Sequence, residues 1–159
     1  MKKPTSQLQR ELRQARPFRS PQQEAGIALV KTADHVRRQV AHVIEPQGIT
    51  PQQYNVLRIL RGAGKEGMPT LEIARRMIER TPGITRLLDR LEAKRLVRRE
   101  RCPTDRRQVL CWIDPPGIEL LKGLDEPVAS AEQAALRGLP ARDLERLIRL
   151  LDAVRGEVE

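Results

Sequence analysis

Apolar residues recur with the 3.6-residue period of an α-helix over most of this chain. The helical pattern covers residues 24–44, 50–62, 68–78, 82–94 and 115–158. Two short apolar runs outside it, Leu96–Val97 and Val109–Ile113, predict the strands of a β-hairpin that turns at residues 103–106. The pattern therefore predicts a mainly α protein with a small β-hairpin, and the chain contains no internal repeat.

Start and stop signals support these helix ends. Two Thr-Pro pairs, Thr50-Pro51 and Thr81-Pro82, are typical of a capping threonine followed by proline at the first helical position. Gln53 completes the pattern of a capping box after Thr50. Segments with Pro and Gly at residues 46–48 and 138–140 are expected to end or interrupt helices.

The same spacing predicts which face of each helix is buried. The expected inward positions are apolar residues three or four apart: Tyr54, Leu57, Leu60; Leu71, Ala74, Met77 or Ile78; and Ile84, Leu87, Leu88, Leu91. The last helical segment also has apolar residues at helical spacing: Leu144, Leu147, Ile148, Leu151 and Val154. Residues 1–22 show no sustained period and predict a mobile arm with a helical turn around residues 8–12.

Positive charge is concentrated in the middle of the chain. Between Arg75 and Arg107 there are twelve Lys or Arg residues and five acids, which supply +7 of the formal net charge of +9. Residues 114–159 carry −4 instead. A basic helix followed by a basic hairpin can neutralise phosphates and release counterions, so we expect double-stranded DNA as the partner. Aromatic residues make up only 2% of the chain, which argues against base stacking on single strands.

The helix expected to begin at Pro82 carries the candidate base-reading residues. Small residues at its start would let the backbone approach DNA; they are Thr81, Pro82 and Gly83. Thr85 and Arg86 can hydrogen-bond base edges, and arginine does so most naturally with guanine. Arg90 and Lys94 lie further along and are better placed for phosphates. The alternative is an amphipathic surface helix with solvated arginines.

The hairpin tip supplies the second half of the candidate site. Asp105 stands beside Arg106 and Arg107. A carboxylate can hold one guanidinium by a charge-assisted pair while the other enters a minor groove, where narrow A·T tracts concentrate negative potential. The alternative is an ordinary turn acid in a charged loop.

These segments together resemble the MarR family of bacterial transcription regulators. The resemblance covers about residues 25–156 and is most specific in Thr85-Arg86-Leu87-Leu88, Leu91-Glu92, Leu96-Val97 and the pair Asp105 and Arg107. It implies a winged helix-turn-helix with N- and C-terminal dimerisation helices. The implied domains are a basic arm (1–22), an N-terminal dimerisation helix (23–48), the DNA-binding domain (49–113) and C-terminal dimerisation helices (114–159).

The resemblance also implies a function. Members of this family form homodimers that bind pseudo-palindromic operators, most often as repressors. In this chain the resemblance implies that Thr85 and Arg86 lie in the groove and that Asp105 orients Arg107. Four positions depart from the family pattern. Ile78 and Arg95 replace glycines, Glu79 replaces an apolar turn residue, and Asp114 replaces a threonine that it can match as a helix cap.

Small effectors or thiol oxidation release many relatives from DNA. Asp34, His35, Arg38 and Tyr54 are the candidate effector contacts, although the effector itself cannot be read from the sequence. His35 and His42 alone do not make a metal site, so no metal or cofactor is expected. Cys102 and Cys111 are expected to be reduced, because the hairpin register places Cys111 opposite Arg99 rather than Cys102.

Other functions are disfavoured by what the chain lacks. No nucleophile–base pair, metal cluster or phosphate-binding loop supports an enzyme. No apolar run approaches the length of a membrane span, and the N-terminus lacks a signal-peptide core, so we expect a cytoplasmic protein. The remaining rivals are a nonspecific architectural DNA binder, a winged-helix protein-interaction module and an RNA-binding winged helix.

Overall fold

The computed structural model describes residues 6–80, 82–105 and 107–156 as two compact units whose boundary lies between Gln39 and Val40. The longer helices are α2 (Pro21–Ile44), α3 (Pro51–Ala63), α4 (Thr70–Arg76), α5 (Ile84–Ala93), α6 (Pro115–Leu136) and α7 (Ala141–Arg155). The short ones are α1 (Gln7–Glu11), η1 (Glu45–Gln47) and η2 (Gly64–Glu66). The strands are β1 (Met68–Pro69), β2 (Val97–Arg101) and β3 (Val109–Ile113). The prediction of a mainly helical fold with a small β wing is confirmed.

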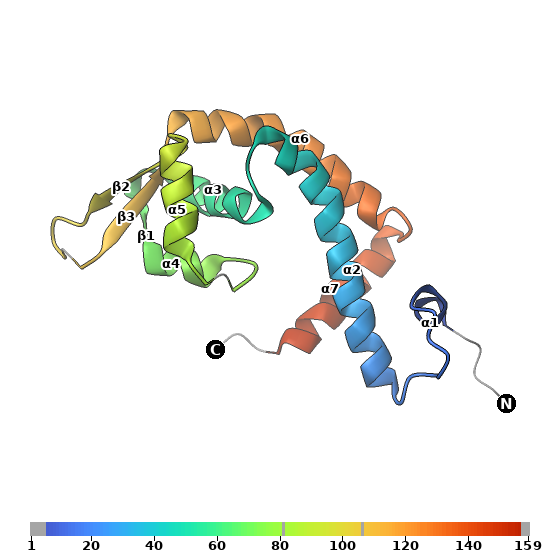
Figure 1. Ribbon diagram of the computed structural model, residues 1–159. Coiled ribbons are helices and arrows are strands. Elements are labelled where there is room, and N and C mark those ends of the chain that lie inside the picture. Colours follow the sequence, from blue (N-terminus) through green and yellow to red (C-terminus); the bar gives the residue numbers. More distant parts are fainter. Residues whose placement is uncertain (1–5, 81, 106, 157–159) are drawn as a thin grey trace. The chain divides into compact units, whose positions relative to one another are not determined.

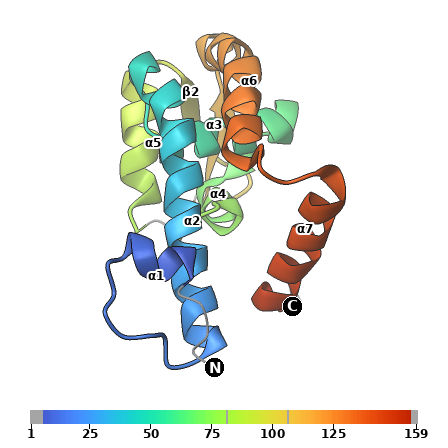
Figure 2. The ribbon, with the colours of Figure 1, turned by 90° about the vertical axis from the view of Figure 1, so that its right-hand side faces the viewer.

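The first unit contains α1 and most of α2 (Figure 2). The expected helical turn near residues 8–12 is present as α1, whose Glu11 carboxylate lies 3.4 Å from the Lys31 ammonium of α2. Helix α2 begins at Pro21, three residues earlier than predicted. The reason is a cap that the apolar pattern does not reveal: the Ser20 hydroxyl accepts the Gln23 N–H at 3.2 Å.

In the second unit, α3 has the predicted ends and the predicted buried face. The Thr50 hydroxyl accepts the Gln53 N–H at 3.2 Å, and the Gln53 side chain accepts the Thr50 N–H at 3.0 Å. This reciprocal pair is the capping box expected from the sequence. Tyr54, Leu57 and Leu60 are buried as predicted. Helix α3 therefore forms the centre of the second unit.

Helix α4 buries a different face from the one predicted. Ile73 is fully buried, whereas Leu71 is 65% exposed and Ile78 is 84% exposed. The helix ends at Arg76, and the extended backbone at Met77 rotates the following residues away from the helical stripe. Met77 itself packs against the core as expected. The placement of Leu71 on the inner face was therefore wrong, and of the two alternatives Met77 and Ile78 it is Met77 that faces the core.

Helix α5 begins two residues later than predicted. Pro82 and Gly83 lie in the preceding turn, and the first helical residue is Ile84. Gly83 has φ +95°, a left-handed conformation that a right-handed helix cannot include. Thr81, the predicted cap, lies outside the described residues. The predicted apolar stripe is confirmed, because Leu88 and Leu91 are buried and Ile84 and Leu87 pack against the core.

The three strands form an antiparallel sheet in the order β1-β3-β2, and the hairpin extends beside α4 and α5 (Figure 1). Strands β2 and β3 lie where the sequence predicts them, and Arg99 is the register partner of Cys111 as expected. Strand β1 was not predicted, because its two residues become a strand only by pairing with Cys111 and Leu110 of β3.

Helix α6 packs on the sheet and on α3 through its first half. Its buried residues are Gly117, Leu121, Leu124 and Val128. A Cβ at Gly117 would lie 2.5 Å from the Leu96 carbonyl oxygen, so glycine permits this close approach. Helix α7 (red in Figure 2) follows after the predicted break and has no buried residue. Among the described residues, no helix has both the length and the hydrophobicity to cross a membrane.

Candidate DNA-binding surface

The first turns of α5 present the predicted base-reading side chains to solvent. Thr85 and Arg86 are the second and third residues of the helix, and both are exposed. Arg90 lies one turn further along and is exposed as well. Because the helix begins at Ile84 rather than at Pro82, Thr85 and Arg86 are closer to its N-terminus than predicted. That end of a recognition helix is the part nearest to the base edges.

Lys94 lies at the other end of α5 and has an internal partner. Its ammonium donates a hydrogen bond to the carbonyl oxygen of Gly48, at the end of η1. The geometry thus connects the C-terminus of α5 to the segment that precedes α3. The predicted phosphate contact of Lys94 stays a prediction, and it would require this ammonium to serve both groups.

The wing tip is ordered by the carboxylate of Asp105. One carboxylate oxygen accepts the backbone N–H of Arg107 at 3.0 Å, and the other accepts the side-chain amide of Gln108 at 3.2 Å. Asp105 therefore acts on Arg107 through the backbone. Arg106 lies outside the described residues. Arg107 and Thr85 both line one cleft, so the structure brings the predicted wing and groove residues together.

That cleft separates the wing from the two helices of the motif. Its volume is about 650 Å³, and residues of α4, α5, all three strands and the hairpin loop line it, Arg99 of β2 among them. Leu71 and Arg75 contribute from α4, Thr85 from α5, and Arg107 and Val109 from the wing side. The exposed Leu71 is therefore an edge of the cleft rather than part of the core.

Arg99 of β2 has a role that the sequence did not reveal. Its terminal Nη2 lies 2.7 Å from a carboxylate oxygen of Asp89 and 2.6 Å from one of Glu92, both on α5. Its Nε also donates to Glu92 at 3.1 Å. These contacts raise the pKa of the Arg99 guanidinium, mainly through the hydrogen bond to Glu92. In the sequence, Arg99 is one of the twelve basic residues between positions 75 and 107, and nothing there predicts a separate function for it.

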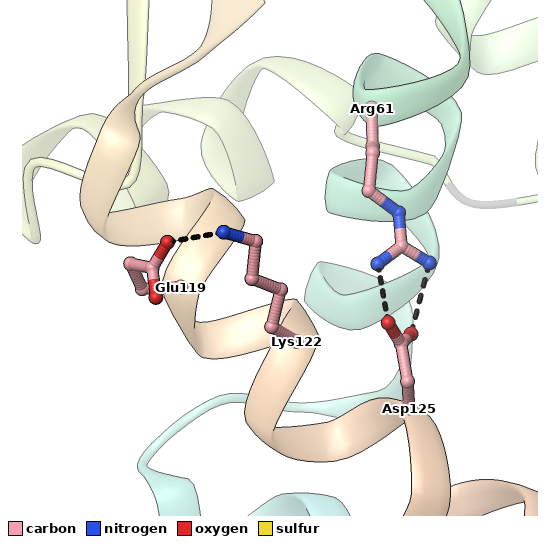
Figure 3. Close-up of polar contacts among 4 residues, drawn as sticks. All are labelled: Arg61, Glu119, Lys122 and Asp125. Carbon is pink, nitrogen blue, oxygen red and sulfur yellow. Dashed lines mark hydrogen bonds and ion pairs between the residues drawn. The ribbon is translucent and has the colours of Figure 1, made fainter.

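A second ion pair connects α3 to α6. The Arg61 guanidinium donates two hydrogen bonds of 2.9 Å to the Asp125 carboxylate, as Figure 3 shows. These bonds hold the pKa of Asp125 below its ordinary value of 3.8. Glu119 and Lys122, also drawn in Figure 3, pair only along α6. Asp114 occupies the N-cap of α6, but its side chain makes no cap bond, so the expectation that it caps the helix as a threonine would is wrong. Its carboxylate lies 3.4 Å from the Arg98 guanidinium instead.

The candidate effector residues belong to the two different units. Asp34 pairs with Arg37 at 2.7 Å and with Arg38 at 2.9 Å, and the hydrogen bond from Arg37 lowers the pKa of Asp34. His35 is exposed on the same helix. Tyr54 lies in the core of the second unit, where burial raises the pKa of its phenol. The effector assignment stays a prediction.

Both cysteines are free thiols in different surroundings. Burial raises the pKa of Cys111. The pKa of Cys102 is lowered by the Thr104 hydroxyl and by backbone N–H groups of Asp105 and Thr104. Within the described ranges, no group of three or more His, Cys, Asp or Glu side chains is placed to hold a metal ion.

Comparisons with known proteins agree on one family. Residues 47–108 match the model described as the MarR family. The crystal structure of a MarR transcription factor from Planctomyces limnophilus is 41% identical, with a TM-score of 0.67 over 85% of this chain and 98% of that one.

Two further relatives extend the comparison. A Thauera aromatica protein described as a transcriptional regulator for the hcr operon is 33% identical over 120 residues; these are 75% of this chain and 64% of that protein. The chain thus spans less than two thirds of that relative. A mutant MarR from E. coli, solved in complex with operator DNA, is 26% identical with a TM-score of 0.74, over 81% of this chain and 91% of that one.

Proposed function

This chain belongs to the MarR family of transcription regulators, and we propose that it binds double-stranded operator DNA in a sequence-specific manner. The family consists of regulators rather than enzymes, which agrees with the sequence-based prediction of a non-enzymatic protein. The observation that carries the proposal is the alignment of Thr85 and Arg107 along one cleft, beside the exposed Arg86 and Arg90.

This arrangement suits a duplex better than another partner. Recognition helices enter the major groove, and a wing beside the helix reaches the adjacent minor groove or phosphates. Under this proposal Arg86 contacts a base edge and Arg107 the neighbouring groove, which are the roles expected from the sequence. The E. coli relative in complex with operator DNA has the same fold at 26% identity, which supports a duplex as the partner.

We further propose that the functional form is a homodimer acting in the cytoplasm. Helix α7 keeps a helical stripe of apolar residues of which none is buried, and Ile148 is 58% exposed and Val154 68% exposed. Such a stripe is stable in water when a second copy covers it. Two-fold symmetry then predicts inverted half-sites about one helical turn, or roughly 10 base pairs, apart.

Repression and response to a small effector complete the proposal and rest on family membership alone. Asp34, His35, Arg38 and Tyr54 are the residues at which an effector response would be tested. Thermal shift against a panel of phenolic and lipophilic compounds, with DNA release as the second readout, checks this part. A compound that stabilises the protein without releasing DNA would contradict the effector role.

The first experiment is selection of bound duplexes from a random library, followed by titration of the winners against salt. We expect an enriched inverted repeat, and an affinity that falls with salt according to the number of phosphates contacted. Salt-sensitive binding without an enriched motif would identify an architectural DNA binder instead. Absence of binding at moderate salt would overturn the proposal and favour a protein-interaction module.

A further inference from the structure

The exposed residues Thr85, Arg86, Arg90 and Arg107 form what we call the reading face. Arg99 differs from its arginines in exposure and in partners. Its side chain is only 20% exposed, and it faces two carboxylates of α5. Arg86 and Arg90, by contrast, project into solvent. A guanidinium held by two carboxylates is a poor candidate for a phosphate contact, because DNA would have to compete with both of them.

The two carboxylates lie close to the groove-reading residues. Asp89 and Glu92 are one turn apart on α5, and Asp89 follows Arg86 by three positions, so their side chains are neighbours on the helix surface. Asp89 is 54% exposed. Without a counter-charge, this acid would repel a phosphate backbone that approaches Arg86 and Arg90.

Arg99 is well supported in the position from which it pairs with them. It lies on β2 opposite Cys111, which is fully buried on the central strand. The Cys111 thiol is in turn 3.6 Å from the hydroxyl of Thr70, at the start of α4. The guanidinium therefore extends from the sheet to α5, and its Nη2 lies within 2.7 Å of both carboxylates.

We propose that Arg99 is a positioning residue for DNA binding, which acts through Asp89 and Glu92 by holding both carboxylates against β2 and out of the path of the phosphates. This inference rests on the proposed DNA-binding function. It separates the arginines that contact DNA from Arg99, which holds the two acids in place. Arg99 contributes no contact to DNA, and its removal weakens binding only while the two acids are present.

A thermodynamic cycle in DNA affinity tests this inference. The full-length wild type is compared with Arg99→Met, with Asp89→Asn/Glu92→Gln, and with the triple variant, on one duplex taken from the selection. We expect Arg99→Met alone to bind roughly tenfold more weakly, and the same change to cost less than about threefold when both acids are already neutral. Circular dichroism and Tm, measured on all four proteins, establish that each is folded.

Each other result overturns a different claim. Equal losses from Arg99→Met in both backgrounds would mean that Arg99 contacts DNA directly. Full affinity of Arg99→Met, or a loss explained by the unfolded fraction, would remove the positioning role. If Arg99→Met fails to fold, Arg99→Gln replaces it in both backgrounds, since it also removes the charge but keeps a side chain that can donate hydrogen bonds. Failure of the wild type to bind any duplex would instead overturn the proposed function itself.

Discussion

At the scale of single residues, the backbone at Arg95 is unusual. Arg95 has φ +57°, in the left-handed region that favours glycine. The conformation closes α5 with a Schellman motif, in which the Leu96 N–H bonds to the Leu91 carbonyl at 3.0 Å and the Arg95 N–H to that of Glu92 at 2.8 Å. The family pattern has glycine at this position. The departure noted in the sequence therefore leaves the fold unchanged but adds local strain.

Arg95→Gly should therefore stabilise the protein. Relief of the left-handed strain is expected to raise the free energy of unfolding by about 1 kcal/mol, even after the larger entropy of glycine in the unfolded chain. Chemical denaturation measures this difference. Arg95→Ala is the matched control, because it removes the same charge and keeps the strain. An equal gain in both variants would assign the effect to charge rather than to backbone.

Arg86 is expected to specify a base, and its neighbour Arg90 to contact phosphate. Arg86→Ala should cost about 1–3 kcal/mol at the cognate site and relax the preference at one base position. Arg90→Ala should weaken binding to all duplexes to a similar extent and make the salt dependence less steep. Repeating the library selection with both variants checks this. An unchanged preference with Arg86→Ala would remove Arg86 from base recognition.

At the scale of elements, the sequence predicts those features that depend on neighbouring residues. It does not predict those that depend on contacts between residues far apart in the chain. The capping box of α3 involves four consecutive residues, so Thr50 and Gln53 could be identified from the sequence. The beginning of α5 depends on the left-handed backbone of Gly83. The Thr81-Pro82 pair resembles the start of α3 in sequence, but it predicted a first helical residue two positions too early. Strand β1 exists only through pairing with β3, more than 40 residues away.

The same distinction applies to the candidate site. The charge of the reading face and the exposure of Thr85, Arg86 and Arg90 follow from helical spacing, and all were predicted. The partners of Arg99 did not follow, because β2 must first fold back on α5 to bring Asp89 and Glu92 within reach. From the sequence alone, such an arginine cannot be distinguished from one that contacts DNA phosphates.

The pairing of α3 with α6 gives the fold an acid-sensitive contact (Figure 3). Arg61 holds the pKa of Asp125 below 3.8. The stabilisation by this pair is therefore complete above pH 3.8 and is lost as the pH falls through the lowered pKa. Both side chains are partly exposed, so the contribution is at most about 1 kcal/mol.

Asp125→Asn should therefore be less stable than the wild type at pH 7, and the difference should shrink below pH 3.8 and disappear once the pH has fallen through the lowered pKa of Asp125. Denaturant titrations at several pH values measure this. Glu119→Gln, which removes a pair confined to α6, serves as the control and should change stability very little. A difference between wild type and Asp125→Asn that persists in strong acid would contradict the linkage.

At the scale of the whole molecule, charge and apolar surface are divided along the chain. The basic residues are concentrated in α4, α5 and the wing, whereas residues 114–159 carry a net charge of −4. The exposed apolar stripe lies on α7, within the acidic part. A dimer contact placed there would be free of the repulsion that two basic reading faces exert on each other.

Ile148→Glu should convert the proposed dimer to a monomer that remains folded, because α7 contributes no buried residue to its own chain. Light scattering is expected to show half the mass, and affinity for the inverted repeat should fall at least about tenfold as the two half-sites lose their linkage. Ala153→Glu introduces the same charge on the opposite face of α7 and should stay dimeric. A dimeric Ile148→Glu protein would place the interface elsewhere.

The pairing of Arg99 with Asp89 and Glu92 has a consequence for how this protein and its relatives diverge. If the guanidinium is useful only where the acids are present, the three positions are under joint selection. Lineages that lose the acids should then be free to lose the arginine, and those that keep the arginine should keep at least one acid. Positions 89, 92 and 99 should therefore covary across the family, while Arg86, which is proposed to contact a base, should change with the operator instead.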